Sequence, residues 1–308
     1  MPSTPTATDR RFQFIRRYPL ISFFAWFFTV GQAFAFTPLI ADSRGVDVPV
    51  QPFIVASTIF GLLLPALVIT RIVEGPEAVT ELLRRAIDVR ATAAWYAVAV
   101  IAVPLAAVAL TVALLGAPSD VSTGAVVSAV LTAFVPAFVL TFLPNNLWEE
   151  VAWTGFVQAR LQARRGPWLA ALIAGPLFAL QHISGFVGGS AAEAVFVLVL
   201  LTVMVTPYRF LTGWVYNRTG NLFLVGLLHA SGNAAAGGSG FGDGFLARLY
   251  PGEQLASMTH LITFAVLGLL TVIVTRGRLG QPRTQRHSTP AHPDDRRPNA
   301  RVEESFHA

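Results

Sequence analysis

Acidic, imidazole and amide side chains interrupt the apolar parts of this 308-residue chain at three places. They are the adjacent Glu149 and Glu150, then His182, and then His229 with Asn233 four residues later. Ionisable side chains are costly inside a lipid bilayer and persist there mainly where they face one another or a wet cavity. Carboxylates, imidazoles and an amide can together activate a water molecule and stabilise an oxyanion. These residue types therefore predict a hydrolase whose site lies within the membrane.

The composition is that of an integral membrane protein. Hydrophobic residues make up 54% of the chain and charged residues only 13%, whereas a soluble domain carries about 25% charged residues. The chain has no cysteine, which excludes disulfides, thiolate metal sites and a cysteine nucleophile.

The net charge of +5 comes from arginine alone, because all 22 basic residues are arginine. Many of them flank the first and last apolar runs, as expected for chain ends that stay in the cytoplasm. We therefore predict a lipid bilayer as partner and no nucleic acid. The arginine-only, cysteine-free composition suggests a bacterium, and we expect a multi-pass protein of its plasma membrane.

The apolar runs predict an all-α polytopic membrane protein with about eight transmembrane helices. A spanning helix needs about 17–25 residues, and runs of this kind occur at 19–41, 50–71, 92–116, 121–143, 191–211 and 258–275. Shorter or more mixed candidates occur at 146–163, 167–183 and 221–236.

Three parts of the chain follow from this pattern. We expect a basic N-terminal segment at 1–18 and a transmembrane domain at 19–279, with a catalytic core at about 120–240. The polar residues 280–308 cannot bury a core and are predicted to form a disordered basic tail.

The loop between the second and third apolar runs predicts a cytoplasmic amphipathic helix on the bilayer surface. Its apolar residues recur at helical spacing against a charged face, and they are Val79, Leu82, Leu83, Ala86 and Ile87.

Equal spacings predict a helical hairpin around Gly166. Glu149 to Arg164 and Pro167 to His182 are each 15 residues long, which as helices corresponds to about 22 Å. An antiparallel pair of such arms brings Glu149 and His182 to the same depth. Whether the first arm crosses the membrane completely stays open at this point: a full crossing puts the arginines near 160–165 outside, and a hairpin without net crossing keeps them inside.

His229 and Asn233 are separated by four residues, which places them on one face of a helix. Small residues surround them in HASGNAAAGG, so a neighbouring helix or a substrate backbone can approach closely.

With these motifs in view, the chain resembles the CPBP family, the CAAX-protease and bacteriocin-processing intramembrane proteases. The family pattern consists of EExxxR, FxxxH and HxxxN/D motifs in that order. Here they correspond to Glu149-Glu150, to Phe178 through His182, and to His229 through Asn233. One position departs from the pattern, because Thr154 stands where the family has an arginine that is thought to brace the site.

The resemblance implies a glutamate-dependent endopeptidase that acts on a membrane-associated peptide or protein. Glu149 would be the general base, and Glu150 would hold the pair or position its helix. His182 and His229 would position water or stabilise developing charge, and Asn233 would donate to the oxyanion. The family name suggests prenylated CAAX substrates, but we expect another membrane or secreted peptide in a bacterium.

Zinc is the alternative to a site without a cofactor. Glu149, His182 and His229 form a possible ligand set with a position open for water. The HExxH motif is absent, and the resemblance favours metal-independent catalysis, so we expect no cofactor.

Structural explanations exist for each cluster taken alone. Glu149 and Glu150 suit a helix start capped by asparagine, His182 suits a hydrogen-bonded structural histidine, and His229 with Asn233 suits a clamp between helices. The order and spacing of all three favour catalysis.

At the level of the whole protein, the alternatives are a catalytically silent scaffold or bacteriocin-immunity protein, which Thr154 supports, and a proton-coupled transporter. A transporter would be expected to show paired repeats, which we do not find.

Two further motifs and one histidine carry less weight. The GxGD sequence at 240–243 is typical of aspartyl intramembrane proteases, which need a second aspartate in the membrane, and the other aspartates lie in loops, surface segments or tails. The GSG at 238–240 fits a serine nucleophile poorly. His260 is predicted to be an interfacial residue at the start of the last helix.

Overall fold

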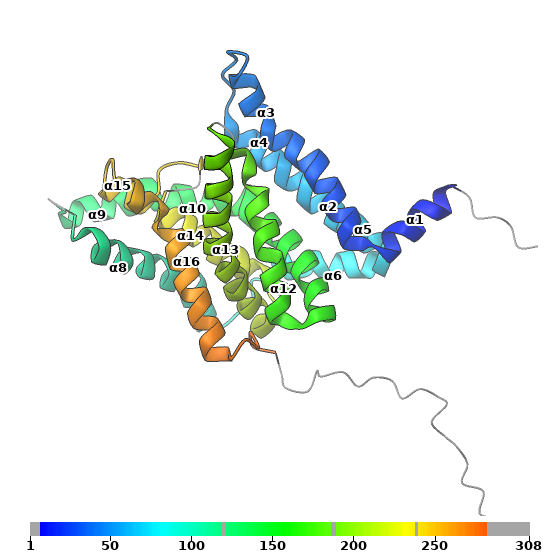
Figure 1. Cartoon of the computed structure of the whole chain (residues 1–308). Helices are drawn as coiled ribbons and strands as arrows, with labels where there is room; N and C mark the ends of the chain where they lie inside the picture. Colours follow the sequence, from blue (N-terminus) through cyan, green and yellow to red (C-terminus); the bar gives the residue numbers. More distant parts are fainter. Residues whose placement is uncertain (1–6, 119–120, 186–188, 238–239, 282–308) are drawn as a thin grey trace, which may run out of the picture.

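The computed structural model describes residues 7–118, 121–185, 189–237 and 240–281. Over these ranges it consists of helices and connecting turns without strands, which confirms the all-α polytopic prediction (Figure 1). The predicted disordered tail lies outside the described residues from 282 onward.

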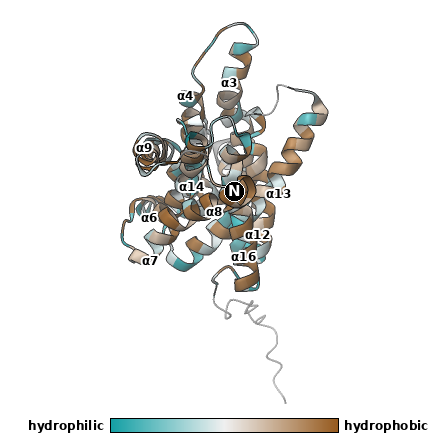
Figure 2. Cartoon of the chain, turned by 90° about the vertical axis from the view of Figure 1, so that its left-hand side faces the viewer, coloured by the Kyte–Doolittle hydropathy of each residue, from teal (hydrophilic) through white to brown (hydrophobic). Residues whose placement is uncertain are grey.

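Six helical stretches are long and apolar enough to cross a membrane. They are Pro19–Asp42, Val50–Glu74, Ala93–Leu115, Thr123–Gln181, Ala191–Thr219 and Gln254–Thr275. Brown, apolar residues run along these helices, and teal residues gather mainly at their ends and in loops (Figure 2). Large apolar side chains such as Val195, Phe196 and Ile273 are exposed on the outer helices, as expected of surfaces that face lipid.

The first two spans form an antiparallel pair that is preceded by α1 (Ala7–Arg17). Their segments are α2 (Pro19–Trp26), η1 (Phe27–Gly31) and α3 (Gln32–Asp42), then α4 (Val50–Ala56), η2 (Ser57–Leu63) and α5 (Leu64–Glu74). The pair crosses at two glycines, because a Cβ added to Gly61 would lie only 2.4 Å from the Cα of Gly31. Such close backbone approach is the usual role of small residues between membrane helices.

The amphipathic helix predicted after the second span is α6 (Pro76–Ile87). Its apolar face packs on protein instead of facing only lipid. Leu82 and Ala86 are buried, and a Cβ on Gly155 would come within 2.8 Å of the Leu82 side chain. Arg85 donates to the hydroxyl of Tyr216 over 2.7 Å. The helix is therefore anchored beneath the segment that carries the predicted catalytic glutamates.

The third and fourth spans contain several wide, π-helical turns. The third is formed by α7 (Ala93–Tyr96), η3 (Ala97–Ala102) and α8 (Val103–Leu115). The fourth comprises α9 (Thr123–Ala129), η4 (Val130–Phe134), α10 (Val135–Thr141), η5 (Phe142–Asn146), α11 (Leu147–Glu150), η6 (Val151–Gln158) and α12 (Ala159–Gln181).

The expected helices at 121–143 and 146–163 are one continuous helical path. Pro144 lies within η5, and Pro136 is the second residue of α10, which follows η4. Wide turns of this kind accommodate the carbonyls that proline leaves without a donor, so the path bends without ending.

The path reverses at Gly166, where φ is 77° and ψ is 167°. Only glycine adopts this conformation without steric cost, and Pro167 starts the returning arm. The hairpin predicted from equal arm lengths is therefore present, and the Gln181 side chain contacts Glu149 across it.

The C-terminal half surrounds one short, central helix. This helix is α14 (Leu222–Ala235), in which nearly every residue is buried. Around it lie α13 (Ala191–Thr219), α15 (Phe245–Leu249) and α16 (Gln254–Thr275). The stretch Thr123–Gln181 is divided into two helices at Gly166, and α14 adds one shorter apolar helix. The described part of the chain thus contains eight apolar helices, in line with the approximate number predicted.

Arginine-bearing helix ends gather on one face of the bundle. Arg160 beside the hairpin tip pairs with Glu74 at the end of α5, and Asn217 near the end of α13 donates to the Leu279 carbonyl over 2.9 Å. The hairpin tip, α6 and the end of α16 thus share one side. Of the two topologies left undecided by the sequence, this favours the one in which the arginines and residues after α16 stay on the cytoplasmic side.

Candidate active site

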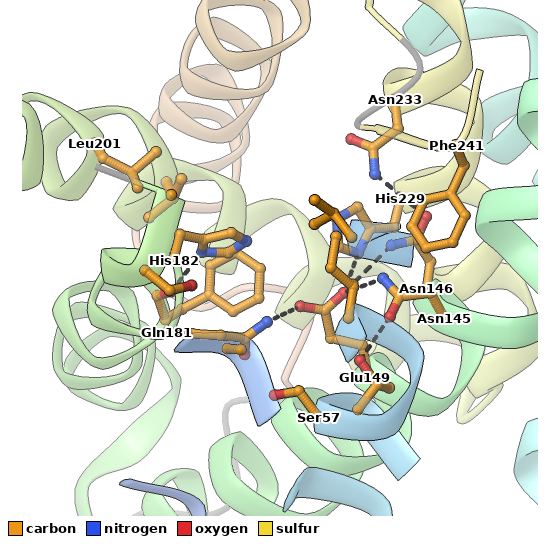
Figure 3. Close-up of a pocket in the computed structure, with 18 of the residues that line it drawn as sticks. Ser57, Asn145, Asn146, Glu149, Gln181, His182, Leu201, His229, Asn233 and Phe241 are labelled. Carbon is orange, nitrogen blue, oxygen red and sulfur yellow. Dashed lines mark hydrogen bonds and ion pairs between the residues drawn. The ribbon is translucent and has the colours of Figure 1, made fainter. Parts of the chain in front are cut away.

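A cavity of about 640 Å³ opens between the N-terminal pair and the C-terminal half. Glu149, His182, His229 and Asn233 all line it, so four of the five predicted site residues share one space (Figure 3). The fifth, Glu150, lies behind this wall and is fully buried.

Glu149 lies at the polar end of the cavity and accepts hydrogen bonds from three amides. Asn146 donates to Oε2 over 3.2 Å and Asn145 to the same oxygen over 3.5 Å. Gln181, on the returning arm of the hairpin, donates to Oε1. The carboxylate of Glu149 is thus held in place by donors from two elements while one of its sides faces the cavity.

Glu150 is held by a buried ion pair with Arg209 of α13. Both side chains have 0% exposure, and the guanidinium lies 3.1 Å and 3.2 Å from the two carboxylate oxygens. Tyr208 also donates to Glu150 over 2.7 Å, and so does the hydroxyl of Thr154. A buried charge needs such a set of partners, because removing one of them leaves the other uncompensated.

An arginine from another helix contacts Thr154, the position at which the family motif has arginine. The second guanidinium nitrogen of Arg209 donates to Thr154 Oγ1 over 2.6 Å and to Gln158 Oε1 over 3.0 Å. Thr154 therefore opens the space into which Arg209 reaches. A buried cation therefore lies beside Thr154, although the motif position itself carries no arginine.

His182 ends the returning arm of the hairpin and is half-buried in the cavity wall. Its Nδ1 lies 3.0 Å from the Phe178 carbonyl oxygen. A carbonyl can only accept, so Nδ1 carries a proton, and Nε2 is an acceptor when the ring is neutral.

His229 and Asn233 lie one turn apart on α14, on the face that meets the glutamates. His229 Nδ1 is 3.1 Å from Glu150 Oε1 and 3.9 Å from Glu149 Oε2. Asn233 donates to Asn146 Oδ1 over 3.2 Å. The three motifs thus meet through direct contacts, and Asn146 links Asn233 to Glu149.

Sequence reasoning missed several residues of this site, namely Asn145, Asn146, Gln181, Tyr208 and Arg209. A signal for Arg209 was available, since it is the one charge in the interior of the 29-residue α13. Membrane-embedded charges mark functional or structural partners by default. The amide residues carried no comparable signal, because asparagine and glutamine are common at helix ends.

His260 and two aspartates line the same cavity as Glu149. His260 belongs to the cavity wall near the start of α16. Asp42, the last residue of α3, and Asp47, in the loop that follows, also line the cavity and are exposed. In the GxGD sequence, Phe241 lines the cavity while Asp243 is exposed.

The zinc alternative requires Glu149, His182 and His229 to converge on one point. In residues 7–118, 121–185, 189–237 and 240–281, no group of three or more His, Cys, Asp or Glu side chains lies close enough to hold a metal ion. Glu149, His182 and His229 are therefore not assembled as a ligand set. The partners of Glu149 are amide donors instead.

Comparison with protein families identifies the region that contains this site. Residues 131–235 match the family model described as type II CAAX prenyl endopeptidase Rce1-like. This region resembles Rce1-like endopeptidases. It contains all three predicted motifs and Arg209, and the match confirms the resemblance to the CPBP family. Comparison with curated proteins gives no significant match, and comparison with solved structures gives none either.

The match over residues 131–235 supports peptidase activity of the CAAX-protease kind at the level of the family. Together with six apolar helices, it supports a multi-pass membrane protein that acts on a membrane-associated substrate.

Proposed function

We propose that this chain is an intramembrane endopeptidase in which Glu149 is the general base. The observation that carries this proposal is the position of the Glu149 carboxylate. It lies at the polar end of a largely apolar cavity, with three amide donors on it and His229 3.9 Å away. A base must be held within reach of the proton that it removes, and this arrangement provides such a hold.

In the proposed reaction, Glu149 takes a proton from water, and the water oxygen forms a bond to the carbonyl carbon of the substrate. The carbonyl oxygen becomes an oxyanion, which Asn233 and His229 stabilise. Collapse of the tetrahedral intermediate breaks the C–N bond, and the proton held by Glu149 passes to the leaving amine. No cofactor takes part in these steps.

His182 and Glu150 have different parts in this scheme. The Nε2 acceptor of neutral His182 positions the attacking water, because its Nδ1 is engaged by Phe178. Glu150 is a positioning residue: it is fully buried, and its ion pair with Arg209 ties the helix of Glu149 to α13.

The substrate is proposed to be a membrane or secreted peptide in the plasma membrane of a bacterium. The cavity flanks are apolar and come from α3 and α13, including Leu39, Leu201, Met204 and Val205. Such flanks suit apolar residues that enter from the bilayer.

The test compares protein termini in membranes that carry wild type or Glu149→Gln at equal levels. Glutamine keeps the shape but cannot act as a base, so we expect cleavage to fall by about 10²–10⁴-fold, the usual contribution of such a group. Glu77→Gln, an exposed carboxylate on α6, is the matched control and should keep wild-type termini. Identical termini in wild type and Glu149→Gln, with both proteins folded, would refute peptidase function and favour the silent scaffold or immunity protein.

A further inference from the structure

The geometry points to a Trp153–Gln181 pair that orients the carboxylate of Glu149, which makes Gln181 and Trp153 positioning residues of the proposed peptidase. This inference rests on the proposed function for its catalytic consequence. Neither residue belongs to the glutamate, histidine and asparagine set predicted from the sequence.

Gln181 bridges Trp153 and Glu149 with its side-chain amide. The indole Nε1 of Trp153 donates to Oε1 of Gln181, and Nε2 of Gln181 donates to Oε1 of Glu149. An indole nitrogen is only a donor and a carboxylate is only an acceptor. The amide between them therefore has one satisfactory orientation, with its oxygen on the indole and its N–H on the carboxylate.

Trp153 is itself fixed, so it can impose this orientation. It has 0% exposure, and its ring packs against Phe27 and Phe178 at centroid distances of 6.4 Å and 5.4 Å, in edge-on geometry in both cases. An indole held on two sides in this way aims its N–H in one direction.

The backbone of Gln181 is held as well. Nε2 of Gln32, the first residue of α3, donates to the Gln181 carbonyl over 3.0 Å. This bond comes from the N-terminal pair and caps the end of the returning hairpin arm. Both the main chain and the side chain of Gln181 are thus fixed before any substrate enters.

Orientation matters because the other oxygen of Glu149 is shared by Asn145 and Asn146. With all three amides presenting N–H groups, the carboxylate is fixed at both oxygens. Preorganised dipoles of this kind need no rearrangement during the reaction, which is the main way in which a protein site lowers a barrier. Loss of the Gln181 donor frees one side of the base.

The experiment is a double-mutant cycle with Trp153→Phe and Gln181→Met, using a cleaved reporter peptide in detergent or vesicles. Trp153→Phe keeps the ring but removes the N–H, and Trp153 does not line the cavity. We expect Trp153→Phe to lower kcat about fivefold and Gln181→Met to lower kcat about 10–100-fold, with KM unchanged in both. The double variant should be no slower than Gln181→Met alone, because both changes act through one amide.

Two control variants separate orientation from packing. Gln181→Glu has nearly the same shape but no N–H for Glu149, and it should lose at least as much kcat as Gln181→Met. Gln162→Glu makes the same chemical change on the other arm of the hairpin, where Gln162 pairs with Asn217 away from the cavity, and it should keep wild-type kcat. Losses that multiply in the double variant, or a rise in KM with unchanged kcat, would overturn the inference.

A readout without catalysis keeps this inference distinct from the proposed function. The chain has six tryptophans, so the indole N–H signals of labelled protein can be assigned by substitution. The Trp153 signal should shift in Gln181→Met and Glu149→Gln and stay in place in Gln162→Glu. If the Trp153 signal shifts in these variants but the wild type cleaves no peptide, only the proposed function is rejected. If the wild type cleaves peptide but the Trp153 signal does not shift, the orienting role is rejected.

Discussion

At the scale of single residues, a motif position without its usual arginine is contacted by an arginine from another helix. Thr154 removes the arginine of the EExxxR pattern, and Arg209 occupies the space with its guanidinium on Thr154 and Glu150. A motif defined by spacing along one helix does not detect such an arginine, because the charge is near the motif in space but distant from it in the sequence.

The exchange predicts a swap experiment between positions 154 and 209. Arg209→Thr leaves Glu150 as an uncompensated buried charge, which costs roughly 3–5 kcal/mol of stability. Thr154→Arg places two guanidinium groups together in the same buried space and is also destabilising. The double variant Thr154→Arg/Arg209→Thr keeps both volume and charge, and we expect it to regain most of the stability and cleavage.

Thermal unfolding in detergent and reporter cleavage measure this prediction. Arg218→Thr, at the exposed end of α13, serves as the control and should behave as wild type. If the double variant were as unstable as the sum of the single variants, Arg209 would not be the counterpart of the motif arginine.

At the scale of the element, α6 combines packing on the core with ion pairs on its outer side. Glu81 accepts from Arg84 over 2.7 Å and 2.8 Å and from Arg85 over 2.7 Å. The hydrogen bonds from Arg84 and then Arg85 lower the pKa of Glu81 from 4.5 to about 2. These pairs stabilise the helix only while Glu81 is ionised.

The lowered pKa of Glu81 predicts how the pairs depend on pH. Because the folded pKa lies below the unfolded one, the stabilisation is complete above about pH 4.5 and is lost as the pH falls towards 2. The difference in Tm between wild type and Glu81→Gln should be nearly constant from pH 7 to 5, shrink as the pH falls further, and vanish only below pH 2, where Glu81 is protonated in the folded state as well. Glu77→Gln, an exposed carboxylate of the same helix, should show no such pH-dependent difference. A difference that persists unchanged at pH 2 would show that the pairs contribute nothing.

At the scale of the whole molecule, the arginine face assigns a side of the membrane to each loop. The hairpin tip near Gly166, α6 and the end of α16 lie together through the contacts of Arg160 and Asn217. The loop between α3 and α4 lies at the opposite end of the first two spans (Figure 1). Positive loops remain in the cytoplasm, so this loop is expected outside.

This topology can be measured directly because the chain has no cysteine. Ser43→Cys and Arg165→Cys each introduce one thiol at an exposed position. A membrane-impermeant thiol reagent should label Ser43→Cys in intact cells, and it should label Arg165→Cys only after lysis. Labelling of Arg165→Cys in intact cells would instead support a full crossing by residues 146–163 on their own.

The sequence by itself determined the class of protein, the approximate number of helices and the three motifs. These features depend on local quantities: the length of apolar runs, the cost of charges in lipid and the spacing of residues on one helix. The equal arms around Gly166 even placed Glu149 beside the end of the FALQH segment. The domain limits, the catalytic roles and the absence of a cofactor stay predictions.

Only the tertiary structure decided which side chains hold the glutamates. Arg209, Tyr208 and Gln181 reach Glu149 or Glu150 from 32 to 59 residues away, and His260 belongs to the cavity wall. The hydrogen bond of an amide or a guanidinium is set by where two helices cross. That crossing depends on close contacts such as Gly31 with Gly61 and on bends near proline, which no spacing along a single helix records.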